Sequence, residues 1–200
     1  GSASGVLLLL PFCCHADTTK IMLYIWRCCL FATLNLLVAF ANENDPIFRA
    51  VQADSMDQIK SALKTSPESL NVQGPGGQSP LMHAVLSGKV RAVKFLLKKG
   101  ADPKVPEKDG YTPMHGAGFQ GRAEIARLLI GHGLDPFDVH KDGHSPMQRA
   151  CWGNEQRHTD TVRVFLEAGA TESDMHKCLQ RTSPATKKLV LEMQAAKEEV

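Results

Sequence analysis

The sequence predicts an all-α protein whose body is an α-solenoid of helix–turn–helix repeats with short hairpin turns, preceded by one hydrophobic helix. Three observations predict this fold: a Ser/Thr-Pro block that recurs every 33 residues, a glycine that follows each block, and an apolar run at 21–41. Of the 200 residues, 43% are hydrophobic and 22% are charged, and the net charge is +2. This balance excludes a disordered chain, and it lacks the marked basic excess of nucleic-acid-binding domains.

The apolar segment 21–41, which follows a leader at 1–20, has three possible roles. Its only non-apolar residues are Arg27, Thr33 and Asn35. A helix over this range spans roughly 30 Å, the thickness of the hydrocarbon core of a bilayer. The first prediction is a retained single-pass anchor in an organellar or endomembrane location, with the basic residues on the cytosolic side and the body on the other side. The alternatives are a signal peptide cleaved after Ala41, which makes the protein secreted or lumenal, and a buried helix.

Similar blocks recur along the body of the chain. Each starts with Ser or Thr followed by Pro: Ser79-Pro80, Thr112-Pro113 and Ser145-Pro146. An alanine lies four residues after each proline: Ala84, Ala117 and Ala150. An apolar residue and then a glycine follow each block: Leu96 and Gly100, Leu129 and Gly133, Phe165 and Gly169. These landmarks keep the 33-residue interval, except that three extra residues precede Phe165 and Gly169.

Each landmark has a physical reason within a pair of helices. The Ser or Thr caps the first helix, and proline fits the first helical position because its missing N–H has no partner there in any case. The alanines let helices approach closely. The glycines end the second helix in the left-handed conformation, which only glycine adopts at little cost. The segments Lys108-Asp109-Gly110 and Lys141-Asp142-Gly143 are expected to form the turns between repeats.

A 33-residue period with these landmarks resembles the ankyrin repeat family. The resemblance divides residues 42–172 into repeats at about 45–77, 78–110, 111–143 and 144–172, and leaves 173–200 as a C-terminal helical cap. In the fourth repeat we expect the segment from Gly153 to His158 to form a loop that holds the extra residues, and Thr159 to cap the second helix. His115 takes the histidine position of the family motif, where the resemblance implies a structural hydrogen bond between repeats.

The sequence offers little evidence of catalysis or of cofactor binding. The turn at Gly74–Gly77 lacks the Lys-Ser/Thr that a phosphate-binding loop requires. The six cysteines do not form the pattern of a disulfide framework, and we expect Cys151 to be a small core residue. The least favoured alternative is a metal- or thiol-dependent enzyme built on Cys151 with His140, His144 and His158.

Protein binding is therefore the predicted function, through the turn tips and the concave surface of the first helices, as the resemblance implies. Three apolar residues, Leu86, Phe119 and Trp152, recur at the 33-residue interval and should form a stripe on that surface. In the competing interpretation, Trp152 packs under the inserted segment. The predicted partner-binding residues are Leu86, Ser87, Phe119, Gln120, Trp152, Gln78, Tyr111, His144, Lys108 and Lys141. We expect a module without cofactors, tethered to a membrane by 21–41 as an accessory or scaffold subunit, or alternatively secreted or lumenal.

Overall fold

The computed structural model describes residues 45–198. The leader and the hydrophobic segment 21–41 lie outside the described residues. Within the described range, no helix is both long enough and apolar enough to cross a bilayer.

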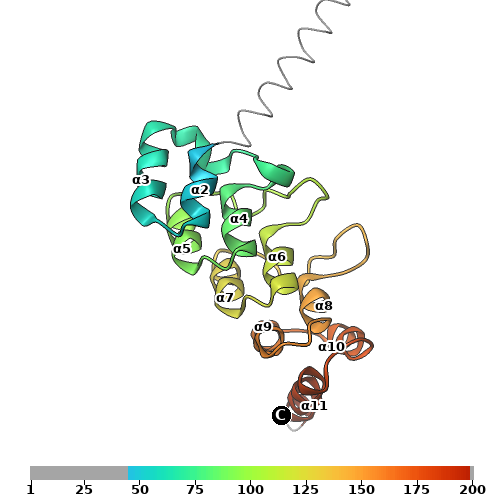
Figure 1. Cartoon of the computed structure of the whole chain (residues 1–200). Coiled ribbons are helices and arrows are strands. Elements are labelled where there is room, and N and C mark those ends of the chain that lie inside the picture. The colour runs from blue at the N-terminus through green and yellow to red at the C-terminus, as the bar shows by residue number, and fades with distance from the viewer. Residues whose placement is uncertain (1–44, 199–200) are drawn as a thin grey trace, which may run out of the picture. The chain divides into compact units, whose positions relative to one another are not determined.

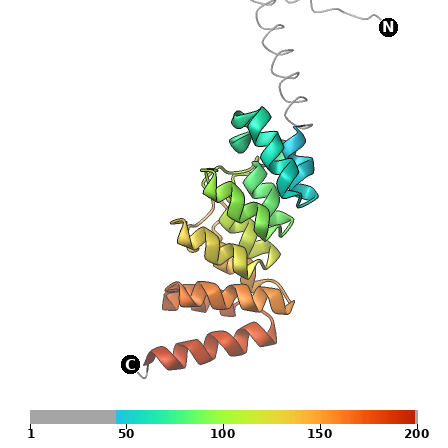
Figure 2. The same ribbon diagram turned by 90° about the vertical axis from the view of Figure 1, so that its left-hand side faces the viewer.

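The regular elements among the described residues are all helices, and they form a stack of helix pairs (Figures 1 and 2). The first helices of the pairs are α2 (Pro46–Gln52), α4 (Pro80–Leu86), α6 (Pro113–Gln120) and α8 (Pro146–Cys151). The second helices are α3 (Met56–Thr65), α5 (Val90–Lys98), α7 (Ala123–Gly131) and α9 (Gln156–Glu167). Two 3₁₀ turns, η1 (Pro67–Asn71) and η2 (Pro75–Gly77), join the first two pairs, and α10 (Glu172–Leu179) and α11 (Pro184–Glu198) follow the last pair.

The Ser-Pro blocks begin first helices as expected, but the Thr-Pro block does so differently. The Ser79 hydroxyl accepts a hydrogen bond from the backbone N–H of Met82, and Ser145 accepts one from the N–H of Gln148. Thr112 makes no such cap, because its hydroxyl bonds instead to Nδ1 of His115 at 2.9 Å. The prediction that each Ser or Thr caps its helix is therefore wrong at Thr112.

Small and apolar landmark residues form the interior of the stack. Their side chains are fully buried: Ala84, Ala117, Ala150, Leu96, Leu129 and Phe165. The glycines after the second helices have positive φ angles of 88°, 82° and 103° at Gly100, Gly133 and Gly169. These alanines, apolar residues and glycines thus take the roles predicted for them.

The inserted residues of the fourth repeat lengthen a helix and do not form a loop up to His158. Helix α9 starts at Gln156, so Thr159 lies inside it and is not its cap. With 12 residues, α9 exceeds α5 and α7, which have 9 each, by the three extra residues. His158 anchors the added turn, because its Nε2 bonds to the Phe119 carbonyl at 3.2 Å. The expected loop is wrong because this contact with the preceding repeat favours helix.

Candidate functional site

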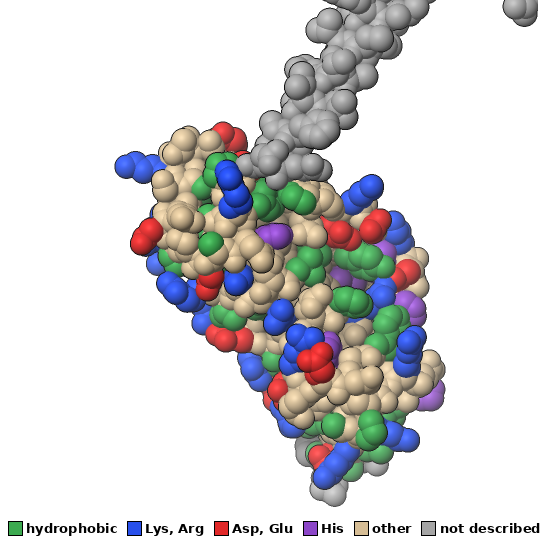
Figure 3. All heavy atoms as spheres, viewed as in Figure 1, with side chains coloured by type: hydrophobic (Ala, Val, Ile, Leu, Met, Phe, Trp, Pro, Cys, Tyr) green, Lys and Arg blue, Asp and Glu red, His purple; other side chains and the backbone are tan. Residues whose placement is uncertain are grey.

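A groove of about 230 Å³ lies between the first helices α4 and α6 and is the strongest candidate for a binding site. Its walls are mostly apolar, and the residues that line it are Met82, Leu86, Glu107, Tyr111, His115, Gly116, Phe119 and Arg149. Figure 3 shows apolar side chains gathered among charged ones on the face that it presents. The 33-residue interval therefore brings two members of the predicted stripe, Leu86 and Phe119, into one groove.

Local structure keeps this groove open. Leu86 and Phe119 lie in the last turns of α4 and α6. A Cβ atom on Gly116 would lie 3.2 Å from Cδ2 of Leu86 and 3.3 Å from Sδ of Met82, so the glycine leaves room between the two helices. Phe119 is 58% exposed, which is unusual for a large aromatic side chain that no partner covers.

A network of polar residues fixes the wall of the groove at the turn tips. The Tyr111 hydroxyl donates to Oδ2 of Asp142 at 2.9 Å and accepts from Nη2 of Arg149 at 3.0 Å. Arg149 also pairs directly with Asp142, and the Tyr111 ring stacks on His140 at 4.0 Å between ring centroids. Tyr111 and Arg149 are therefore held in place before any partner binds.

Asp142 is ionised as part of this network. Its partial burial acts to raise its pKa, but hydrogen bonds from Tyr111 and His140 outweigh that effect. The backbone N–H of His144 and the charge of Arg149 add to the lowering, so the pKa of Asp142 lies well below its usual range.

His115 is buried under the groove and does not make the hydrogen bond between repeats that the resemblance implied. Its Nδ1 bonds to Thr112 within the same repeat, and its Nε2 has no hydrogen-bond partner among the described residues. The bond between repeats comes from His140, whose Nε2 donates to the Asp109 carbonyl at 3.1 Å. The edge of the His115 ring packs against His140, with ring centroids 5.7 Å apart.

Burial of His115 predicts a loss of stability in mild acid. Burial, and secondarily the charge of His140, lower the pKa of His115. The unfolded chain binds a proton near pH 6.5 that the folded chain excludes, so acidification from pH 7.5 to 5.5 lowers the free energy of unfolding. We expect His115→Gln to lose less stability than wild type over this range in urea titrations. The variant keeps part of the dependence because burial also lowers the pKa of His83.

The exposed His132 provides the matched control for this prediction. His132→Gln should keep the full pH dependence of the wild type. If the free energy of unfolding changes with pH equally in the wild type and in His115→Gln, the loss of stability in acid does not come from His115.

Trp152, the third member of the predicted stripe, lies outside the groove. It is half-buried at the C-terminal end of α8, and its ring meets His144 edge-on at 4.7 Å between centroids. The guanidinium groups of Arg149 and Arg181 lie 4.8 Å and 5.3 Å from its centroid. None of these three contacts involves the inserted segment, under which the competing interpretation placed Trp152.

The other predicted partner-binding residues are spread over the tips and the first helices. Gln78 bonds to His83 at 3.2 Å, and the Ser87 hydroxyl donates to Gln52 at 3.1 Å. Lys108 and Lys141 are exposed and form no ion pair with another described residue, and Gln120 is half-buried. Four residues of the site were not among those predicted from the sequence: Met82, Glu107, Arg149 and Arg181. The first three lie close to the repeat motifs, whereas Arg181 lies outside the repeat period and no sequence signal points to it.

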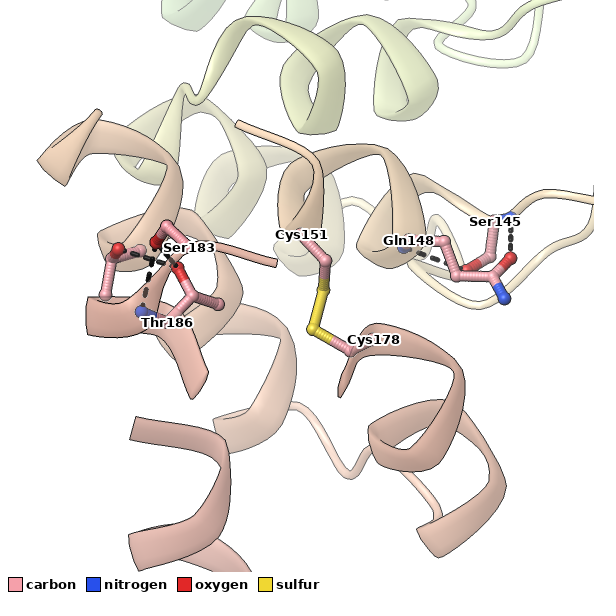
Figure 4. Close-up of a disulfide and its surroundings, with 7 residues drawn as sticks. Ser145, Gln148, Cys151, Cys178, Ser183 and Thr186 are labelled. Carbon is pink, nitrogen blue, oxygen red and sulfur yellow. Dashed lines mark hydrogen bonds between the residues drawn. A yellow bond between two sulfur atoms is a disulfide. The ribbon is translucent and has the colours of Figure 1, made fainter. Parts of the chain in front are cut away.

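Cys151 forms a disulfide with Cys178, which corrects two expectations (Figure 4). The bond joins α8 to α10, with Cα atoms 5.4 Å apart, and both residues are buried. The expectation that the cysteines form no disulfide is wrong for this pair, and Cys151 has no free thiol for the enzyme alternative. Within the described part of the chain, no group of three His, Cys, Asp or Glu side chains is placed to hold a metal ion.

Comparison with known families agrees with this repeated architecture. The family model described as "Ankyrin repeats (many copies)" matches residues 63–117, and "Ankyrin repeats (3 copies)" matches residues 100–177. Together they span more than half of the chain. The chain belongs to the ankyrin repeat family. Its ankyrin repeats are similar to the Notch-regulated ankyrin repeat-containing proteins of Homo sapiens and Mus musculus, each 33% identical over 75 residues.

This similarity to the two ankyrin relatives is partial on both sides. The matched segment covers 36% of this chain and 66% of the length of each relative. Ankyrin repeats are in general non-catalytic modules that bind other proteins, so membership of the family indicates protein–protein interaction.

Proposed function

We propose that this ankyrin repeat chain binds a protein partner in the groove between α4 and α6. The observation that carries the proposal is Phe119, which is 58% exposed in an apolar groove whose wall is fixed by Tyr111 and Arg149. Large aromatic side chains in preformed apolar grooves often dominate the binding energy of protein interfaces. The exposed Lys108 and Lys141 at the turn tips supply charges for a polar rim.

Phe119→Ala should weaken capture of the partner at least tenfold, which corresponds to about 1.4 kcal/mol. The melting temperature should change little, because most of the Phe119 side chain is already exposed. Quantitative cross-linking pull-downs from native membranes, with wild type and variant compared in parallel, measure the change.

Leu191→Ala is the matched control, because Leu191 is 46% exposed on α11 and does not line the groove. Its capture of the partner should equal that of wild type. If both variants lose partner capture equally, or if Phe119→Ala loses none, the partner binds elsewhere on the chain.

We propose that the repeats lie in an oxidising compartment, either tethered to a membrane by 21–41 as an accessory subunit or released as a lumenal or secreted protein. The disulfide supports this compartment, because disulfides persist in the secretory pathway and are rare in the cytosol. For a retained anchor, the basic residues Lys20 and Arg27 favour the cytosolic side for the N-terminal end of 21–41. The repeats then lie on the opposite side, which is the oxidising one.

Three measurements test this proposed location. Thiol labelling of denatured, unreduced protein should leave Cys151 and Cys178 unmodified, whereas labelling of both would indicate a reducing compartment. Carbonate extraction and mass determination of the mature N-terminus distinguish the membrane-tethered protein from the released one. Resistance to extraction supports the anchor, and a new N-terminus at Asn42 supports the signal peptide.

A further inference from the structure

The side chains around Trp152 adjoin the groove through Arg149. We define the Trp152 cluster as His144, Arg149, Trp152 and Arg181. Arg149 belongs to both sites, because it lines the groove and also lies over the indole ring. A partner segment that leaves the groove towards the fourth repeat therefore reaches this cluster next.

The two arginines of the cluster differ in their partners. Arg149 is neutralised by Asp142, which the hydrogen-bond network keeps ionised. Arg181 is exposed and forms no ion pair with any residue between 45 and 198, yet its guanidinium is held over the Trp152 ring. A stacked guanidinium with free N–H groups is oriented to bind a carboxylate through two hydrogen bonds.

The charge of the cluster matches a singly charged ligand. Arg149 and Asp142 cancel, which leaves the single positive charge of Arg181. A carboxylate carries one negative charge at neutral pH, whereas a phosphate monoester carries nearly two. Phosphorylated residues are bound by clusters of arginines, whereas Arg181 is the only arginine of the cluster without an acidic partner, so the site favours an Asp or Glu side chain.

The spacing between the sites sets the spacing within the ligand. Phe119 and Trp152 are one repeat apart, and packed helices lie roughly 8–10 Å from each other. An extended chain advances about 3.3 Å per residue, so roughly three residues span the two sites.

We infer that the chain recognises an extended acidic segment of its partner, with a bulky apolar residue in the groove and an Asp or Glu about three residues away that pairs with Arg181. This inference rests on the proposed function, since it names the chemistry of the partner that the groove binds. Leu86 and Phe119 select the apolar side chain, and Arg181 selects the carboxylate.

Selection of random 12-residue peptides displayed on phage, against the immobilised full chain in detergent, tests the inference. Wild type should enrich peptides with a bulky apolar residue and an Asp or Glu two to four positions away. Arg181→Glu should keep the apolar residue and replace the acid by Lys or Arg. Lys98→Glu makes the same charge change on the second helix α5 and should select the wild-type pattern.

The outcomes separate this inference from the proposed function. If Phe119→Ala selects the wild-type peptides, the groove is not the binding site and the proposed function fails. If Phe119→Ala loses the apolar preference but Arg181→Glu changes nothing, only the role of Arg181 fails. The inference is also overturned if wild type enriches Lys or Arg, which would pair with Glu107. It is likewise overturned if wild type enriches no peptide at all.

A synthetic peptide from the selection provides a quantitative second test. Replacing its acidic residue by the matching amide should weaken binding to wild type at least fivefold in fluorescence anisotropy. It should not weaken binding to Arg181→Glu, because the introduced carboxylate repels the acidic peptide. Phosphoserine at the same position should bind no more tightly than the acid. Tenfold tighter binding of the phosphoserine peptide would show that the Trp152 cluster binds phosphate, and it would overturn the proposed pairing of Arg181 with a carboxylate. A single cooperative thermal transition of Arg181→Glu, close to that of wild type, excludes misfolding.

Discussion

Gly118→Ala is expected to destabilise the protein by about 2 kcal/mol, because one added methyl group has no room. A Cβ atom at this position would overlap the carbonyl oxygen of Pro146, the first residue of α8. The carbonyl oxygen belongs to the backbone, and the backbone also fixes the position of the Cβ atom. Neither can rotate away, so α6 and α8 must move apart. This cost exceeds the gain of about 1 kcal/mol that alanine brings to a helix interior. In a stack of neighbouring units, such a separation weakens the coupling between the third and fourth repeats.

Gly131→Ala is the matched control for this prediction. Gly131 is the last residue of α7, and a Cβ atom there would meet nothing within 4 Å. The same substitution should therefore leave the free energy of unfolding unchanged or raise it slightly. Urea titrations followed by circular dichroism measure both variants, and equal stability of the two would show that α8 does not approach α6 as closely as described.

Removing the disulfide is expected to cost about 3.5 kcal/mol, the value that the chain-entropy model gives for a loop of this length. Cys151 and Cys178 lie 27 positions apart in the sequence. Their bond restricts the conformations of the unfolded chain, in which the α8 and α10 segments would otherwise move apart. The double variant Cys151→Ala/Cys178→Ala keeps small apolar side chains at both buried positions, so its loss of stability reports mainly the covalent link.

Reduction of the wild type provides an independent measurement of the same quantity. Dithiothreitol should lower the free energy of unfolding of the wild type by an amount similar to the double substitution. It should leave the double variant unchanged. A wild-type unfolding curve that does not respond to the reductant would show that the two thiols are not bonded in solution.

The repeated architecture was predictable because local rules determine it. Proline at the first helical position, glycine with positive φ after the second helix and alanine between helices each follow from the backbone alone. These rules recur at one interval, so Leu86 and Phe119 could be assigned to a common surface before any coordinates were known.

Contacts between distant parts of the chain were not predictable in this way. The inserted turn of α9 is helical because His158 reaches the Phe119 carbonyl, a contact across 39 positions. The disulfide depends on how α10 packs on α8, and Arg181 reaches Trp152 from beyond the last repeat. His158, Cys178 and Arg181 do not belong to the 33-residue pattern, so the pattern could not place their contacts.

The disulfide also makes the two ends of the stack mechanically unequal. A protease or translocase that pulls from the C-terminus removes α11 first and then meets a covalent loop at Cys178. It must then pass two strands of chain through its pore together or wait for a reductant. A machine that pulls from the N-terminal side meets no disulfide between α2 and Cys151 in the described chain. Forced unfolding of this protein therefore has a direction, with the N-terminal repeats first.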